Sequence, residues 1–206
     1  MTTDAEGSEA HYFGRSPLVA SKRSSVTLAL ADVHLTLATD RGVFSRGAVD
    51  AGTHYLLQEA PSPPLTGDLL DLGCGYGPIA CVLGRRAPDA TVWAIDPNER
   101  ARALCADNAI ANGAPNVRAV DADDVPADVR FEAIWSNPPV RIGKAALHDL
   151  LARWLGRLAP TGHAVLVVQK HLGADSLTTW LAERGHPVRR LGSRQGYRLL
   201  EVGAAA

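Results

Sequence analysis

The chain has 206 residues, of which 46% are hydrophobic and 21% charged, and its formal net charge is −1. These values suit an ordinary globular domain with a sizeable core. A nearly neutral balance excludes a general electrostatic attraction to nucleic acid or anionic membranes, although a local basic patch can still bind RNA. The first residues are polar and acidic, unlike a signal peptide, and no apolar stretch is long enough to cross a bilayer. We therefore expect a soluble, cytoplasmic protein.

Three cysteines occur, Cys74, Cys81 and Cys105, with no C-x-x-C pair and no histidines at metal-binding spacing. This pattern favours ordinary, partly buried thiols in a reducing compartment over a metal or redox site. No metal is expected.

The N-terminal part predicts a small β extension. Residues 1–24 are expected to form a flexible segment, and the patterns at 26–30 and 34–38 predict two short strands joined by a turn. A helix is expected from Asp50 through Glu59, where the Pro61-Ser-Pro-Pro64 cluster ends it. Residues 25–206 are expected to form a single domain. Residues 25–60 would make its N-terminal extension and residues 61–206 its core.

Strand and helix patterns alternate through this core. Strands are predicted at 68–72, 91–95, 117–120, 133–136 and 164–168, and helices at 78–86, 99–111, 144–158 and 176–184. Such alternation is typical of a doubly wound α/β fold, in which helices cover both faces of a parallel sheet. The segments 187–191 and 197–202 flank a glycine-containing turn and predict a hairpin that adds an antiparallel edge.

A glycine loop, Gly73-Cys74-Gly75-Tyr76-Gly77, follows the first core strand directly. Spaced glycines between a strand and a helix are typical of a nucleotide-binding turn, because they admit positive φ angles and close approach of a ligand. A dinucleotide site requires a glycine where Pro78 stands. Asp71, two residues before the loop, would repel a pyrophosphate but suits the ammonium group of S-adenosylmethionine.

Two further acidic positions follow the next two strands. Asp96 lies 25 residues after Asp71, near the spacing of about 20 at which an acid binds ribose hydroxyls, and it is followed by Pro97 and Asn98. Asn98 is the better candidate for capping the following helix, which leaves Asp96 for the ligand. One acid of 121–124 could accept the adenine amino group, and we choose Asp123, with a solvated turn as the alternative.

The segment Asn137-Pro138-Pro139-Val140 follows the fourth core strand. Consecutive prolines end the strand and leave a stiff turn that presents carbonyl groups. If the Asn137 side-chain oxygen and the Pro138 carbonyl each accept one N–H, a delocalised amine or amide nitrogen becomes tetrahedral and directs its lone pair at a methyl sulfonium. Positioning and preorganised dipoles then supply the catalysis. The alternative is an ordinary Asn-Pro turn.

Together these motifs resemble the "small domain" family of S-adenosylmethionine-dependent methyltransferases, which includes the 16S rRNA guanine-N2 methyltransferases. The likeness covers about residues 39–202 and extends beyond the two motifs to 39–45, 49–53, 108–113, 167–170 and 196–198. It implies a Rossmann-like, seven-stranded sheet with an N-terminal segment folded over the cofactor. Phe44 and Thr53 thereby become candidates for contacting its methionine end, with a packing role as the alternative for Phe44.

Two departures from that family bear on the substrate. Enzymes with this chemistry usually carry an aromatic residue after Asn-Pro-Pro to stack on the target base, whereas this chain has Val140. The rRNA enzymes also tend to carry a second, duplicated domain, and this chain is expected to form a single one. Its oligomeric state is not predicted.

Basic residues gather near the acceptor turn. Arg141 and Lys144 follow it, and the terminal hairpin carries Arg189, Arg190, Arg194 and Arg198. We expect some of them to contact RNA phosphates, a solvated surface being the alternative.

Three functions remain open from the sequence. The first is N-methylation of a nucleobase amine in RNA, with guanine N2 of rRNA the favoured acceptor. The second is N-methylation of a protein glutamine or a small-molecule amine. The third is a cofactor-binding domain without turnover.

Overall fold

The computed structural model describes residues 19–205. The prediction of a flexible segment concerns residues 1–18 for the most part, and these lie outside the described residues. Further on, the predicted flexible segment makes defined contacts, because the Ser21 hydroxyl and the Lys22 backbone N–H both donate to the carboxylate of Asp40.

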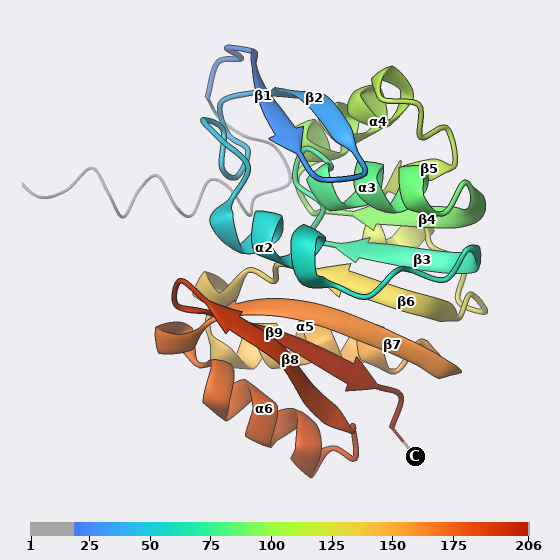
Figure 1. Cartoon of the computed structure of the whole chain (residues 1–206), viewed down its shortest axis with the longest axis vertical. Coiled ribbons are helices and arrows are strands. Elements are labelled where there is room, and N and C mark those ends of the chain that lie inside the picture. The colour runs from blue at the N-terminus through green and yellow to red at the C-terminus, as the bar shows by residue number, and fades with distance from the viewer. Residues whose placement is uncertain (1–18, 206) are drawn as a thin grey trace, which may run out of the picture.

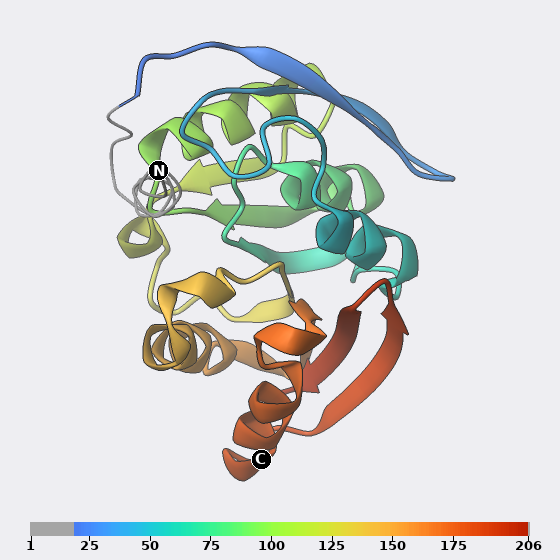
Figure 2. The same ribbon diagram turned by 90° about the vertical axis from the view of Figure 1, so that its left-hand side faces the viewer.

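The N-terminal extension consists of a hairpin and a helix, as predicted. Strands β1 (Ser24–Ala29) and β2 (His34–Thr39) pair antiparallel in a sheet of their own. They alternate between buried and exposed residues, and the hairpin lies across helix α4 (Glu99–Ala111), as Figure 2 shows. Helix α2 (Ala51–Glu59) follows, with Asp50 as its N-cap.

Asn108 of α4 ties the hairpin to the core. Its side-chain oxygen accepts the Ala38 N–H at 2.7 Å, and its amide donates to the carbonyls of Ala38 and Tyr76, each at 2.8 Å. One buried side chain therefore bridges β2 and the glycine loop.

Seven strands form the main sheet in the order β5-β4-β3-β6-β7-β9-β8. The first five in that order run parallel: β5 (Val117–Val120), β4 (Asp89–Ile95), β3 (Thr66–Leu72), β6 (Phe131–Ser136) and β7 (Leu158–Gln169). Strand β9 (Tyr197–Gly203) pairs antiparallel with β7 and with β8 (Val188–Arg194), which forms the outer edge. The predicted α/β class, seven strands and antiparallel C-terminal hairpin are confirmed.

Helices cover both faces of this sheet (Figure 1). Side chains of α2, α3 (Pro78–Arg86) and α4 pack in one hydrophobic cluster, and those of α5 (Lys144–Leu155) and α6 (Ala174–Glu183) in another. Three short 3-10 turns follow strand ends, η1 (Ala122–Asp124), η2 (Val140–Ile142) and η3 (Lys170–Leu172). Among residues 19–205, no helix is long and apolar enough to cross a membrane.

The largest boundary error lies between α5 and β7. The sequence predicted a helix to 158 and a strand from 164, but α5 ends at Leu155 and β7 begins at Leu158. Gly156 caps the helix, and the pairing of β6 with β7 shifts register near Phe131. A Cβ on Gly162 would clash with the Phe131 carbonyl oxygen, so only glycine allows β7 to approach β6 this closely at the register shift.

Candidate active site

A cavity of about 790 Å³ lies where β3, β4, β5 and β6 end, at the edge of the sheet that faces the viewer in Figure 2. Ligands of open α/β sheets bind at this edge. Most of the predicted site residues line it: Phe44, Thr53, Gly73, Cys74, Gly75, Asp96, Pro97, Asp123, Asn137, Pro138, Pro139, Val140 and Arg141. Asp71, Gly77 and Lys144 do not.

The glycine loop closes one side of the cavity. Gly73 and Gly75 have positive φ angles of 81° and 54°, and a Cβ on either would meet no atom within 4 Å. The backbone N–H groups of Gly73 and Cys74 both donate to the Ile95 carbonyl at 2.9 Å, which fixes the loop against β4. These two glycines leave space for a ligand against the backbone.

Gly77 has another role. It caps α3 with a φ of 93°, and a Cβ there would lie 2.7 Å from the Cys105 sulfur of α4. Its missing side chain therefore permits the close packing of α3 on α4. The cysteines match the sequence prediction in that all three are free and buried, and burial raises the pKa of the Cys81 thiol.

Asp71 lies beneath the loop and is fully buried. One carboxylate oxygen accepts the Ala80 N–H of α3 at 2.8 Å, while the other has no hydrogen-bond partner among residues 19–205. Burial raises the pKa of Asp71 to about 8, and the nearby charge of Asp96 adds to the effect. The structure thus gives Asp71 a contact with the first turn of α3.

Asp96 faces the cavity from the end of β4. Its two oxygens accept the backbone N–H groups of Gly75 and Asn98, at 3.0 and 2.8 Å. Burial raises the pKa of its carboxyl group. Asn98 caps α4 by accepting from the N–H groups of Arg100 and Ala101, as predicted. Each Asp96 oxygen keeps a lone pair for a ligand hydroxyl.

Two acids of the loop after β5 line the cavity. Asp123 forms an ion pair with Arg153 at 3.0 Å, and its side chain is 74% exposed. Asp121 caps η1 and pairs with Arg102 at 3.2 Å, with a side chain only 28% exposed. Both therefore stand as candidates for the adenine contact.

The Asn137 side chain is held by the first turn of α2. Its amide nitrogen donates to Asp50 Oδ1 at 2.7 Å and to Thr53 Oγ1 at 3.0 Å. Because these two bonds use the amide hydrogens, the amide oxygen is left as an acceptor in the cavity that Asn137 lines.

The proline turn has a defined backbone shape. The Val140 N–H donates to the Pro138 carbonyl at 2.8 Å, and Pro139 has φ −74° and ψ 73°, the values of an inverse γ-turn. The Pro138 carbonyl keeps a second lone pair for another donor. Ser136 anchors the preceding strand, because its hydroxyl donates to the Leu72 carbonyl at 2.6 Å.

Several cavity residues lie in segments that carry the family likeness but received no functional role from the sequence, notably Asp50, Tyr76, Gln169 and Tyr197. The sequence indicated Asp50 as a helix N-cap. It did not indicate that the carboxylate oxygen that caps the helix also accepts a hydrogen bond from Asn137. Gln169 reaches the cavity as the last residue of β7, and Tyr197 reaches it through the pairing of β9 with β7, which is a long-range contact.

Comparison with known proteins defines the class. The family model for the methyltransferase small domain matches residues 34–201. A Bacillus subtilis protein, "uncharacterized protein YbxB", is 34% identical over 195 residues, covering 93% of this chain and 97% of that protein. Ribosomal RNA small subunit methyltransferase C of Pseudomonas aeruginosa is 34% identical over 178 residues, covering 84% of this chain and 52% of that protein. The chain thus spans about half the length of this methyltransferase.

Solved structures agree on the fold. The T. thermophilus 16S rRNA N2 G1207 methyltransferase, in complex with AdoMet and guanosine, superimposes with a TM-score of 0.76 at 24% identity. It matches 91% of this chain and 52% of its own. The ribosomal protein L11 methylase of Lactobacillus delbrueckii subsp. bulgaricus gives 0.59 at 19% identity, covering 75% of this chain and 77% of its own.

Fold and site together define an S-adenosylmethionine-dependent methyltransferase with a Rossmann-like sheet. The chain belongs to the methyltransferase small domain family. Its relatives include rRNA methyltransferases.

Proposed function

We propose that this protein methylates an exocyclic amine of a nucleobase in RNA, with guanine N2 of rRNA as the favoured acceptor. One observation carries the proposal: Asp50 and Thr53 occupy the amide hydrogens of Asn137, which leaves its oxygen as an acceptor in the cavity that the glycine loop also lines. A reaction on ribosomal RNA would take place in the cytoplasm, as the sequence predicts.

The cofactor would lie across the glycine loop. S-adenosylmethionine, when bound, supplies an electrophilic methyl group on its sulfonium. The space above Gly73 and Gly75 accommodates it, and the Asp96 carboxylate can accept the ribose hydroxyls. The oxygen of buried Asp71 that has no hydrogen-bond partner among residues 19–205 lies outside the cavity lining and would attract the cationic end of the cofactor from beneath the loop, once ionised.

Other cavity residues complete the proposed cofactor site. Phe44, 52% exposed, and Thr53 would border the methionine end, while Asp123 or Asp121 would accept the adenine amino group. Cys74 and Pro97 line the same wall.

The acceptor nitrogen would be held by two oxygens. Asn137 Oδ1 and the Pro138 carbonyl each accept one N–H, which turns the nitrogen lone pair toward the methyl group. No side-chain base is required before transfer, because the nitrogen becomes acidic once it is methylated. Pro139 keeps the turn rigid.

A protein glutamine amide is the second candidate acceptor. Val140 borders the acceptor position and offers no ring to stack on a base, and an amide would need none. The two acceptor oxygens suit either nitrogen equally well.

Labelled methyl transfer distinguishes these acceptors. We would incubate the protein and labelled S-adenosylmethionine with ribosomal subunits, purified rRNA and a protein fraction, and identify the product nucleoside or amino acid by mass spectrometry. We expect label in rRNA as N2-methylguanosine. Label confined to glutamine would replace the RNA acceptor, and absent cofactor binding in calorimetry would reject both.

Asn137→Ala is the matched variant in this assay. It removes the acceptor oxygen while leaving the glycine loop intact, so transfer should be lost while cofactor affinity changes little. Full activity in Asn137→Ala would contradict the role given to this residue.

A further inference from the structure

Tyr197 is a cavity-lining aromatic residue to which the motifs give no role. It begins β9, where it pairs with Gln169 at the end of β7, and both side chains line the cavity. It directly follows the exposed turn residues Gln195 and Gly196, so Tyr197 stands at the border between the cavity and the tip of the hairpin.

The Tyr197 ring is fixed at two points. Its hydroxyl accepts the Gln169 amide N–H at 3.0 Å. Its edge lies against α2, because a Cβ on Gly52 would approach Tyr197 Cε1 to 2.6 Å and Cδ1 to 2.9 Å. Glycine at position 52 leaves room for the ring, which stays half-buried with part of its surface toward the cavity.

The ring and the acceptor group contact the same helical turn. Asn137 bonds to Asp50 and Thr53, and Tyr197 packs on Gly52 between them. The contacts of Tyr197 and Asn137 on α2 are therefore less than one helical turn apart.

The walls on the two sides of this position differ. Tyr197 packs with the hydrophobic cluster of the α2 face, whereas Val140 packs with the cluster of the α5 face. Both residues line the one cavity, and Asn137 stands between these faces at the end of β6. A flat group held by Asn137 would thus have Val140 toward one side and the tyrosine ring toward the other.

We propose that Tyr197 is the aromatic wall of the acceptor subsite and takes a planar heteroaromatic ring, the purine base whose exocyclic amine Asn137 holds. This rests on the proposed function of the cavity. Stacking on an aromatic side chain binds bases of any sequence, and it supplies the contact that Val140 cannot make. Gln169 is a positioning residue, which holds the ring by its hydroxyl.

The test uses 2-aminopurine riboside, a fluorescent purine that carries an exocyclic amine and whose emission is quenched by stacking. It is titrated into the protein saturated with S-adenosylhomocysteine. The variants are Tyr197→Phe, which keeps the ring, and Tyr197→Leu and Tyr197→Met, which fill the space without one. Calorimetry with S-adenosylmethionine checks that each variant retains a folded cofactor site.

We expect Tyr197→Phe to quench the probe as the wild type does but to bind it somewhat more weakly, because it loses the hydroxyl through which Gln169 holds the ring. Tyr197→Leu or Tyr197→Met should bind it more weakly, by between about fivefold and about a hundredfold, and with the quench lost. Equal quenching in a cofactor-binding Leu or Met variant, or none in the wild type, would overturn the proposal. Ring-dependent quenching without methyl transfer to RNA would support the subsite while rejecting the RNA methyltransferase function.

Discussion

Asp50 accepts three hydrogen bonds through one carboxylate oxygen, from the backbone of Gly52 and Thr53 and from the amide of Asn137. The residue that starts α2 is therefore also the one that orients the acceptor group. An oxygen shared in this way couples the position of the proposed catalytic side chain, Asn137, to the N-terminal end of α2.

Asp50→Ala should lower kcat by about ten- to a hundredfold, because the Asn137 amide loses its strongest anchor and the acceptor oxygen is misplaced. Loss of the N-cap should also reduce the free energy of unfolding by about 1 kcal/mol. Steady-state kinetics and urea unfolding measure the two effects.

Asp50→Asn is the matched control, since its amide oxygen can still cap the helix and accept from Asn137. It should retain most of the stability and of kcat. Equal losses in the Asn and Ala variants would argue that charge, and not positioning, is the essential property.

Asp71 makes stability depend on pH. Its pKa is about 8 in the fold against an ordinary value of 3.8. Between these values the folded protein holds a proton that the unfolded chain releases, so the free energy of unfolding should fall as pH rises from about 4 to about 8. The slope from this group is at most about 1.4 kcal/mol per pH unit.

Urea unfolding of the wild type and Asp71→Asn from pH 5 to pH 8 measures this slope. The Asn variant has no proton to lose at this position, so its stability should decline less steeply over that range. Parallel curves would show that Asp71 is already ionised in the folded protein.

At the scale of elements, α3 and α4 pack closely because Gly77 lacks a side chain. Gly77→Ala should destabilise the fold by about 1–3 kcal/mol, through its positive φ and the contact with Cys105. Cys105→Ala in the same chain should recover part of this loss, and a double-mutant cycle in urea measures the coupling.

Gly47→Ala is the control substitution for Gly77→Ala. A Cβ at position 47 would meet no atom within 4 Å, and the φ angle there is not positive, so the substitution should leave stability nearly unchanged. If Cys105→Ala recovered nothing, backbone strain alone would account for the cost at Gly77.

The elements that sequence patterns predicted best are those with local end signals. Helix α3 begins at Pro78 after a glycine and α4 begins after its Asn98 cap, and both were predicted with the observed bounds. The start of β7 was missed because a register shift opposite Phe131 decides it, and no local pattern encodes that partner.

The same distinction applies to the candidate site. Motif residues such as Asp96 and Asn137 could be selected from their place after strands, and they line one cavity. Tyr197 lies in the segment 196–198 that carries the family likeness, but its place in the cavity depends on the pairing of β9 with β7, which no local pattern encodes. Asp71 was selected as a carboxylate two residues before the glycine loop and Lys144 as a cation after the proline turn, but Asp71 is fully buried and neither residue lines the cavity.

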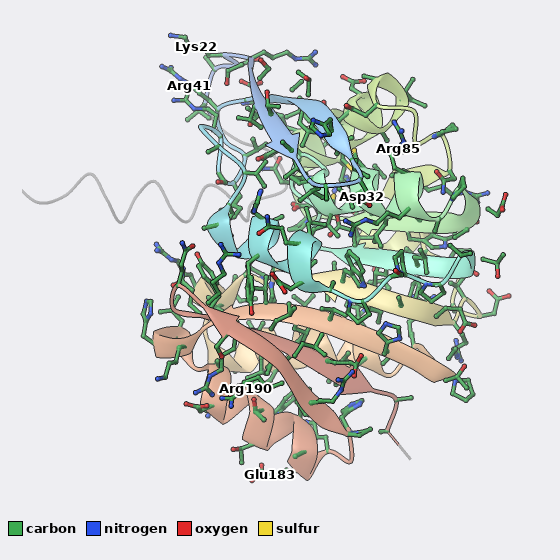
Figure 3. The ribbon with its side chains drawn as sticks, viewed as in Figure 1. Lys22, Asp32, Arg41, Arg85, Glu183 and Arg190 are labelled. Carbon is green, nitrogen blue, oxygen red and sulfur yellow. The ribbon has the colours of Figure 1, made fainter. Side chains whose placement is uncertain are left out.

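For the whole molecule, positive charge is distributed unevenly around the cavity. Arg141 lines it and Lys144 starts α5 nearby. Three hairpin arginines form ion pairs: Arg189 with Glu201, Arg194 with Glu59 and Arg198 with Asp175. Arg190 is the hairpin arginine labelled in Figure 3, and it borders a second hollow together with Lys170.

Replacing Arg141 and Lys144 with Ala should weaken RNA binding and reduce its salt dependence, because phosphate contacts release counterions. A filter-binding titration across salt concentrations measures both. Arg85→Ala with Arg118→Ala removes the same charge from the last turn of α3 and the start of β5, and should change neither. Equal effects from the two double variants would contradict a local RNA contact.

The bridge made by Asn108 has a consequence for the N-terminal hairpin. Because one side chain bonds to both β2 and the Tyr76 carbonyl, displacement of Asn108 would break hydrogen bonds to the hairpin and to the glycine loop together. We therefore expect the two segments to be coupled, so that a ligand that favours the ordered loop also favours the docked hairpin. The hairpin outside the main sheet would thus contribute to the stability of the proposed cofactor site.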